Sequence, residues 1–360
     1  MTRIKFIITT LLCFSLTVTA GFSKNSEKNA ASEINAPWQF AVISDTQNND
    51  RSPDNRACIN SEILILTAAD IADIEPDFVL VSGDLVNGWL RNGGTAFSDQ
   101  YKNWRRAMNP VFRKNIRVYA VRGNHDDGPE RFALQPLPRR MRPKKKSLAL
   151  LKKAFKKTVV QPYTPLNGPD KEKGLTYSFD YRNTRIIGLD QYTDGQHKIN
   201  QQWLNRQVAR KRKTHLFVFG HEPAFGTDYP DNLSFYKKKR DLFWNSIGHG
   251  GGKIYFCGHA HFYNRSLIED SNGNEIWQII NGTGGGLLQD WSGSYMDSDR
   301  VMCEYHDGDH YGYILVTIDG VKATIEWRAL VDVPDAEWKV LDSFSYSAGP
   351  AVTEIKSATD

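Results

Sequence analysis

The sequence predicts an α/β protein in which two mixed β-sheets pack face to face with helices on the outside. The first observation behind this is that three short β-branched runs, ending near Asp45, Gly83 and Gly123, alternate with segments of helical spacing. Such alternation is typical of βαβ crossovers and a largely parallel sheet. The second is that the chain becomes rich in strands and hairpins after His261. Hairpins favour antiparallel pairing, so a second sheet packed on the first is expected.

The first third of the chain is predicted to contain three strands and two helices. Apolar residues recur at helical spacing after a polar loop, and Pro76 ends that helix because its ring excludes a further turn. The predicted elements are a strand at about 38–45, a helix at about 59–74, a strand reaching residue 83, a helix that carries Trp104 and Met108, and a strand at 116–121.

A basic segment follows the third strand. Residues 139–157 include ten Lys and Arg side chains and no acidic ones, and residues 147–155 have the apolar spacing of an amphipathic helix. One interpretation is a solvated basic face, which is what most charge runs are. The other is a positive flap that draws anionic substrates toward the site.

The second half of the chain is predicted to supply the second sheet. Short apolar runs rich in β-branched and aromatic residues are separated by turn residues, which is typical of strands. The predicted elements are a hairpin of 175–180 with 185–190, an exposed helix at 200–211, and strands at 215–219, 253–257, 263–268, 276–280, 311–318 and 323–330.

Residues 1–20 are predicted to be a secretory signal peptide. Arg3 and Lys5 precede an apolar run that is too short to span a bilayer comfortably, and Val18-Thr19-Ala20 offers small residues for cleavage. We therefore expect an exported protein, periplasmic or secreted, without a stable membrane span. Residues 21–36 are predicted to be a mobile leader, 37–335 a single domain with a basic insertion at about 129–173, and 336–360 a C-terminal tail.

The composition narrows the classes of partner. The chain has 46 Lys and Arg against 41 Asp and Glu, a net charge of +5 that becomes +3 without residues 1–20. This balance is too weak to predict a specific nucleic acid as a partner. The remaining cysteines, Cys58, Cys257 and Cys303, are too few for a disulfide framework, and pairing of Cys257 with Cys303 stays open. The oligomeric state is not predicted.

Residues able to bind metal ions follow five of the predicted strands. Because parallel strands bring their carboxyl ends to one rim of a sheet, these side chains are expected to converge. Carboxylate, imidazole and amide oxygen groups are ligands for hard or borderline divalent and trivalent ions. The candidate ligands are Asp45, Gln47, Asp84, Asn124, His221, His259 and His261.

Two local features support these turns as ligand carriers. Gly83, Gly123 and Gly258 each lie directly before a candidate ligand, where tight turns need a residue that tolerates unusual φ. His259 and His261 would share a face of an extended segment. The other histidines match no motif and are interpreted as surface or core residues; these are His197, His215, His249, His306 and His310.

In their order and residue pattern, the five turns resemble the motifs of the calcineurin-like metallophosphoesterase superfamily. That family's pattern is an Asp-x-His turn, Gly-Asp, Gly-Asn-His-Asp/Glu, a lone His and Gly-His-x-His. It is similar to this chain from about Trp38 to His261, with an Asp-x-Gln first turn. The stretch Gly258-His259-Ala260-His261-Phe262-Tyr263-Asn264-Arg265 resembles purple acid phosphatases. The resemblance implies a four-layer αββα fold.

The resemblance also implies a role for each motif residue. Asp45 and His261 would hold one metal ion, and Asp84 would bridge it to a second ion held by Asn124, His221 and His259. His125 would lie beside the ions and donate a proton to the leaving-group oxygen. Two divalent or trivalent ions are implied, with Fe, Mn or Zn expected and Mg or Ca as alternatives. A hydroxide held by the ions would then attack phosphorus in line.

Two positions depart from the family pattern. Gln47 replaces a histidine, and a neutral amide is a weaker and harder ligand than imidazole. Asn87 stands where many members have Asp or Tyr, so the orienting partner of His125 is open, with Asp126 and Asp127 as candidates.

The predicted function is that of an exported metallophosphoesterase hydrolysing phosphomonoesters of small phosphorylated substrates, with Asp84 and His125 at the reacting centre. One alternative is a phosphodiesterase acting on nucleotides or phospholipid head groups. An alternative of another class is a non-catalytic anion-binding protein that uses the basic segment.

Overall fold

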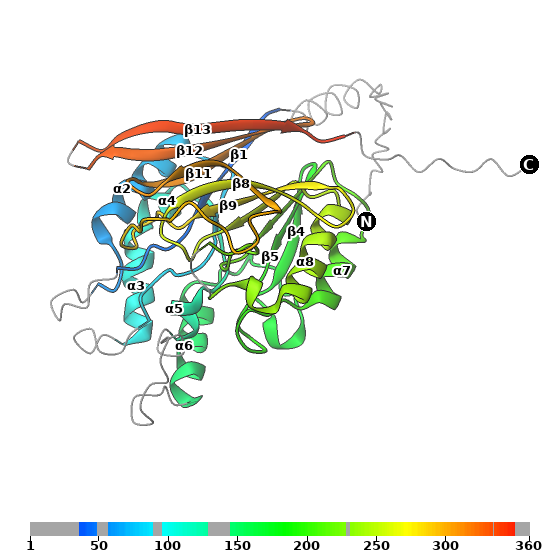
Figure 1. The fold of residues 1–360 in the computed structure, drawn as a ribbon. Coiled ribbons are helices and arrows are strands. Elements are labelled where there is room, and N and C mark those ends of the chain that lie inside the picture. The colour runs from blue at the N-terminus through cyan, green and yellow to red at the C-terminus, as the bar shows by residue number, and fades with distance from the viewer. Residues whose placement is uncertain are drawn as a thin grey trace, which may run out of the picture. The chain divides into compact units, whose positions relative to one another are not determined.

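Two β-sheets lie face to face in the chain from Pro37 onward, as the sequence predicts (Figure 1). The six-stranded sheet has the order β13-β12-β11-β1-β2-β3, and the seven-stranded sheet has the order β10-β8-β9-β7-β6-β5-β4. Both sheets are mixed. Strands β1, β2 and β3 are parallel in the first, and β5, β6, β7 and β9 are parallel in the second. The remaining strands pair antiparallel.

This computed structural model describes residues 36–48, 57–88, 96–128, 145–227, 231–333 and 335–349, the side chains of 145–148 excepted. The predicted signal peptide, residues 129–144 of the basic insertion and residues 350–360 lie outside these ranges, as does nearly all of the predicted leader. Within the described ranges, no helix has the length and apolar character needed to cross a membrane.

The six-stranded sheet consists of β1 (Trp38–Ile43), β2 (Phe78–Val81), β3 (Arg117–Ala120), β11 (Tyr311–Asp319), β12 (Lys322–Asp332) and β13 (Glu337–Ser347). The seven-stranded sheet consists of β4 (Tyr177–Tyr181), β5 (Thr184–Gly188), β6 (His215–Phe219), β7 (Ile254–Cys257), β8 (Tyr263–Glu269), β9 (Glu275–Asn281) and β10 (Val301–Asp307). The helices are α2 (Ser61–Ile74), α3 (Phe97–Ala107), α4 (Asn109–Arg113), α5 (Asn124–Asp127), α6 (Lys145–Thr158), α7 (Gln201–Val208) and α8 (Lys237–His249), with 3₁₀ turns η3 (Asp170–Glu172) and η4 (Leu233–Tyr236).

Aromatic side chains fill the space between the two sheets. The Phe40 ring of β1 stacks on Phe78 of β2 with centroids 5.2 Å apart, and it meets Phe217 of β6 edge-on at 5.3 Å. All three are buried. Burying a phenylalanine contributes about 1.5–3 kcal/mol, so this aromatic layer is a major part of what holds the two sheets together. The rigid sandwich fixes the strand ends from which the site is built.

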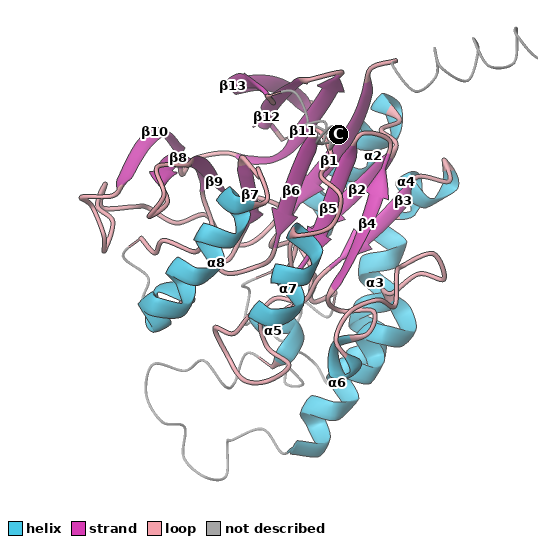
Figure 2. Cartoon of the chain, turned by 90° about the vertical axis from the view of Figure 1, so that its right-hand side faces the viewer, coloured by secondary structure: helices cyan, strands magenta, loops and turns pink. Residues whose placement is uncertain are grey.

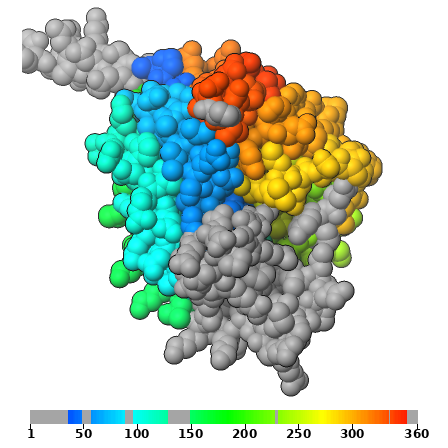
Figure 3. Space-filling model, turned by 90° about the vertical axis from the view of Figure 1, so that its left-hand side faces the viewer, coloured from blue at the N-terminus to red at the C-terminus, as the bar shows by residue number. Residues whose placement is uncertain are grey.

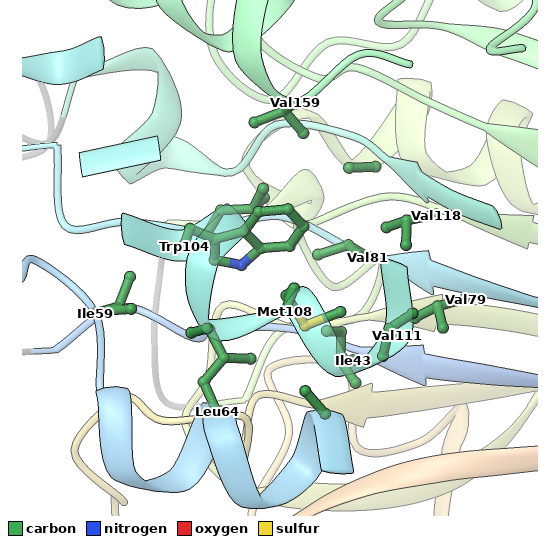
Figure 4. Close-up of a cluster of buried hydrophobic side chains, with 14 of the residues drawn as sticks. Ile43, Ile59, Leu64, Val79, Val81, Trp104, Met108, Val111, Val118 and Val159 are labelled. Atoms are coloured by element: carbon green, nitrogen blue, oxygen red, sulfur yellow. The ribbon is translucent and has the colours of Figure 1, made fainter. Parts of the chain in front are cut away.

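Helices cover the outer face of each sheet and complete the four layers. Helices α2, α3, α4 and α6 pack on the six-stranded sheet, where Trp104 lies among Ile43, Val81 and Val118 (Figure 4). Helices α7 and α8 cover the seven-stranded sheet (Figure 2). Helix α7 was expected to be exposed, but its residues Trp203 and Leu204 are buried against that sheet.

The end of the domain differs from the expectation. Residues 336–360 were interpreted as a tail, but Glu337–Ser347 forms the edge strand β13, which pairs along the length of β12. In Figure 3 the surface of the C-terminal strands, coloured orange to red, adjoins the surface of the N-terminal residues, coloured blue. Strand β10 was not predicted either. Both are edge strands with mainly exposed or half-exposed side chains, so they lack the apolar runs that mark buried strands.

Candidate metal centre

The parallel strands β1, β2 and β3 bring four of the candidate ligands, Asp45, Gln47, Asp84 and Asn124, to one edge of the six-stranded sheet. Ile43 of β1 lies opposite Val81 of β2, and Val81 lies opposite Ala120 of β3. The turns that follow are joined by backbone hydrogen bonds: Asp45 N–H donates to the Gly83 carbonyl at 3.0 Å, and Thr46 N–H donates to the Asp84 carbonyl at 2.9 Å. The turns after β6 and β7 reach the same place from the other sheet, since the His259 N–H donates to the Asp45 carboxylate at 2.9 Å.

Three candidate ligands have left-handed backbone conformations. Asp45 has φ 55°, Asp84 has φ 51° and His259 has φ 74°. For residues with a side chain this conformation costs about 1–2 kcal/mol each, so the surrounding contacts must hold it. It turns the side chain sharply off the strand direction. His259 and His261 therefore do not lie on an extended segment as expected, because a turn closed by the Ala260 N–H and the Gly258 carbonyl has His259 at its centre.

The glycines before the ligands serve two different purposes. Gly83 has φ 101°, as predicted for a tight turn. Gly123 has an ordinary φ of −100°, and Gly258 is not left-handed either. At these two positions glycine is needed because there is no room for a side chain. A Cβ on Gly123 would lie 2.1 Å from Asp84 Oδ1, and one on Gly258 would lie 2.0 Å from Asp45 Oδ2.

Gly123→Ala is therefore expected to damage the centre through overpacking. The new methyl group would also lie 2.4 Å from the Asp84 backbone nitrogen, which cannot rotate away. We expect a loss of about 1–3 kcal/mol in the free energy of unfolding, together with weaker metal binding. Urea unfolding and metal titration measure both. Gly349→Ala is the control, since a Cβ there meets no atom within 4 Å. Parent-like stability and metal binding in Gly123→Ala would contradict this reading of the turn.

One group of donors consists of Asn124, His221 and His259. The Asn124 Oδ1 lies 2.9 Å from His221 Nε2 and 3.0 Å from His259 Nδ1, and these two ring nitrogens are 3.2 Å apart. All three side chains are buried. The Nδ1 atom of His221 donates to the Ser82 carbonyl at 2.9 Å, which turns Nε2 toward the group.

A second group consists of Asp45, Gln47 and His261. The His261 Nε2 lies 3.5 Å from Asp45 Oδ1 and 3.1 Å from Gln47 Nε2. Gln47 thus points its amide nitrogen into the cluster, while its Oε1 has no hydrogen-bond partner among the described residues. A 180° rotation of the amide exchanges these two atoms, so the oxygen reaches the same position when it faces a cation.

Asp84 lies between the two groups. Its Oδ2 is 3.3 Å from Gln47 Nε2 on one side and 3.3 Å from His221 Nε2 on the other. Its Oδ1 accepts a hydrogen bond from the His125 backbone N–H at 2.8 Å. The structure therefore brings all seven predicted residues into one buried cluster, with a single carboxylate oxygen shared by both groups.

The electrostatics of the cluster favour a bound cation. Burial would raise the pKa of Asp84, but His221 and His125 lower it well below its usual value. Burial opposes charge on His221, yet Asp84 and Asp45 raise the pKa of its imidazole to about 10. Burial and the charge of His221 lower the pKa of His259 to about 4. Buried carboxylates need a positive partner, and a metal ion among these oxygen and nitrogen atoms would replace the proton on His221.

The donor set also fits a metal ion by geometry. Single ligand atoms of Asp84, His221 and His259 all lie within 4.8 Å of one another, and Asn124 Oδ1 adds a fourth. Carboxylate, imidazole and amide donors in one buried space match the ligands of borderline transition metals. The residues present therefore suit the ions that the sequence predicts.

His125 lies beside the cluster rather than in it. Its Nδ1 donates to the Asn87 backbone carbonyl at 2.9 Å, and its Nε2 lies 3.9 Å from Asp84 Oδ2. The suggestion that Asp126 or Asp127 orients this ring is wrong. The Asn87 backbone carbonyl orients the ring. Sequence cannot identify this partner, because every residue has a backbone carbonyl.

The two aspartates stabilise the turns instead. Asp126 accepts hydrogen bonds from the backbone N–H groups of Leu85 and Gly123, at 3.2 and 3.0 Å, and so ties the Asp84 turn to the Asn124 turn. Asp127 pairs with the buried guanidinium of Arg122 at 2.6 Å. Arg122 also makes a two-pronged contact with Asp190 after β5. Sequence reasoning missed these supports because they join positions far apart in the chain.

The remaining predictions concern residues outside the cluster. His215 is a buried core residue, as expected, but His197 lies between the carboxylates of Glu222 and Asp231. A cavity of about 400 Å³ beside α8 has His197 in its wall and none of the seven candidate ligands. Neither Cys257 nor Cys303 forms a disulfide.

Comparisons with known proteins identify the family and the fold. The family model of calcineurin-like phosphoesterases matches residues 39–263. Among curated proteins, no significant match was found. Similar solved structures include a purple acid phosphatase from yellow lupin (17% identity, TM-score 0.60, covering 87% of this chain and 54% of that one) and PhoD (15% identity, TM-score 0.62, covering 87% and 70%).

A dimetal phosphatase from Danio rerio is also similar, with 14% identity, a TM-score of 0.52 and coverage of 87% of this chain and 99% of that one. At these identities the structures show a shared fold. This chain spans about half the length of the lupin protein. The family model, by contrast, covers the five turns from Asp45 to His261. From that match, the chain belongs to the calcineurin-like phosphoesterase family.

Proposed function

We propose that this phosphoesterase hydrolyses the phosphomonoesters of small substrates at a centre of two metal ions. The observation that carries the proposal is the position of Asp84 Oδ2, 3.3 Å from a member of each donor group. Asp45, Gln47 and His261 would hold one ion, and Asn124, His221 and His259 the other. Fe, Mn and Zn suit these mixed donors best, and Mg or Ca are weaker alternatives.

Bound ions would supply Lewis acidity toward a phosphoryl oxygen and lower the pKa of a water molecule toward neutrality. The chain's own residues supply orientation and the proton. Because the Nδ1 of His125 donates to the Asn87 carbonyl, its Nε2 faces the cluster. The side chain is 20% exposed, so a substrate can reach it. A proton on Nε2 is placed to pass to the leaving-group oxygen as the ester bond breaks.

Metal removal tests this proposal. The purified protein is treated with a chelator and then supplied singly with Mn, Zn or Fe, and hydrolysis of p-nitrophenyl phosphate and bis-p-nitrophenyl phosphate is measured. We expect activity to disappear and return with metal, and the monoester to be the better substrate. Activity that survives complete metal removal would refute the two-metal mechanism. Faster hydrolysis of the diester would instead favour the phosphodiesterase alternative.

We also propose that the protein is exported and acts in the periplasm or outside the cell. The support is the sequence of residues 1–20, a basic start followed by an apolar run and small residues. Mass spectrometry of the protein purified from each cell fraction tests this proposal. A protein that stays in the cytoplasm and keeps residues 1–20 would overturn it.

The position of the basic segment favours a role in catalysis over the non-catalytic alternative. Of the basic segment, the structure describes α6, whose Leu151 and Phe155 are buried against the six-stranded sheet layer. Lys152 donates to the Lys171 carbonyl and to Thr193 Oγ1, at 3.1 and 3.3 Å. Helix α6 also contacts α5, which begins with Asn124 and His125. A basic helix at this position would raise the local concentration of anionic substrates, which supports the second interpretation of the segment.

A further inference from the structure

The imidazoles of the cluster are oriented through the ring nitrogens that face away from it. His221 and His261 each donate from Nδ1 to a backbone carbonyl, that of Ser82 at 2.9 Å and that of Leu287 at 3.0 Å. Both rings therefore present Nε2 to the cluster. His259 is reversed. Its Nδ1 faces Asn124 and His221, so its Nε2 points outward.

A carboxylate lies on the outer side of His259. Asp231 Oδ2 is 3.9 Å from His259 Nε2, in the chain segment between β6 and η4. This distance is longer than a hydrogen bond, but a carboxylate there still favours a proton on Nε2. A proton on Nε2 leaves the electron pair of Nδ1 facing Asn124 and His221, which is the tautomer that a metal ligand requires.

Asp231 is itself held in place by His197. The His197 Nε2 lies 3.1 Å from Asp231 Oδ1, and its Nδ1 lies 2.9 Å from Glu222 Oε2. Glu222 directly follows His221 in the chain. The row Glu222, His197, Asp231 therefore begins beside one ligand histidine and ends beside the other.

The side chain of His197 is held in one position by its surroundings. His197 is 7% exposed, has a left-handed φ of 58°, and its ring stacks on Phe235 with centroids 5.2 Å apart. Burial opposes charge on the imidazole, yet hydrogen bonds to Asp231 and Glu222 raise its pKa to about 9. A buried cation between two carboxylates keeps both in fixed positions.

We propose that Asp231 is a positioning residue for His259, and that His197, anchored by Glu222, holds Asp231 in place. The inference rests on the proposed function, because it concerns a histidine that would bind the second ion. A carboxylate beside the outer nitrogen of a ligand histidine favours the tautomer that binds metal and raises the basicity of the inner nitrogen. The role differs from catalysis, since Asp231 would act on the substrate only through His259.

The test measures metal affinity and not only activity. Asp231→Asn in the full chain keeps the size of the side chain and removes its charge. We expect the affinity for Zn²⁺ in competition with a chromogenic chelator to fall about 10–100-fold, the usual cost of losing such a partner. The visible spectrum of the Co²⁺-loaded protein should also change, because one ligand is reoriented. The unfolding midpoint without metal should stay close to that of the parent.

Two further variants make the result decisive. His197→Gln should lower affinity in the same direction, and the double variant should be little weaker than Asp231→Asn, since the residues act in series. The matched control is Asp307→Asn, which removes another carboxylate paired with a histidine, His310 at 2.9 Å. It should leave Zn²⁺ affinity and the Co²⁺ spectrum unchanged.

The outcomes separate this inference from the proposed function. Parent protein that binds no metal would overturn both. Parent protein that binds metal, with Asp231→Asn equal to it in affinity and Co²⁺ spectrum, would overturn the inference alone. Loss of affinity that is matched by the Asp307→Asn control would also overturn it, because the effect would then not be specific to Asp231.

Discussion

Asp84→Asn is expected to lower phosphatase activity by on the order of 10³-fold, the upper end of the range for removal of a preorganised electrostatic group. The reason is that Asp84 Oδ2 is the oxygen shared by the two donor groups. An amide nitrogen in its place would carry hydrogen atoms toward both groups and would bind neither ion. The remaining Oδ1 can still accept from the His125 N–H, so the turn itself should persist.

The control for Asp84→Asn is Asp319→Asn. Asp319 is exposed and follows Ile318, which lies opposite Trp38 at the start of β1, so it stands at the edge of the sheet remote from the cluster. Asp319→Asn should retain full activity. Activity of Asp84→Asn within the range of this control, in a variant that still unfolds cooperatively, would mean that Asp84 does not join the two groups as proposed.

His125→Asn is the second large effect. General-acid groups contribute about 10²–10⁴-fold, so we expect kcat for an alkyl phosphate to fall by that order. The loss for p-nitrophenyl phosphate should be much smaller, because p-nitrophenolate leaves without a proton. Metal affinity should not change, since the ring of His125 lies 3.9 Å from Asp84 and outside both donor groups. Steady-state kinetics on the two substrates, with metal analysis of each preparation, makes the comparison.

Equal losses on the two substrates would contradict the role of His125 as proton donor. They would indicate instead that its ring stabilises charge on the phosphoryl group, which both substrates share. A large fall in metal content would show that the ring holds the cluster together. The assignment therefore depends on the difference between the substrates and not on the size of either loss.

Much of the fold is readable from sequence because its central strands are buried. The runs before Asp45, Gly83 and His221 are apolar and rich in β-branched or aromatic residues, and they form strands that pair in parallel. Strand β13 was missed for a physical reason. Trp338, Val340, Phe344 and Tyr346 alternate along it, but most of these side chains are half or largely exposed, and the buried Asp342 interrupts the pattern.

The candidate ligands were predictable because each follows a strong strand signal, whereas their supports were not. The orienting partners of His125, His221 and His261 are backbone carbonyls, which cannot be predicted from the type of any residue. The row from Glu222 to Asp231 depends on His197, which lies 25 positions before Glu222 and matches no motif. Such contacts arise from the packing of loops, and packing is decided only in three dimensions.

Anomalous diffraction from a Mn²⁺- or Zn²⁺-loaded crystal tests the central claim most directly. We predict two peaks about 3.5–4 Å apart, the separation usual in two-metal phosphatases. One should contact Asp45 and His261, the other should contact Asn124 and His259, and Asp84 should touch both. Density for one ion alone, for ions bound elsewhere, or for none would contradict the two-metal centre on which the proposed function depends.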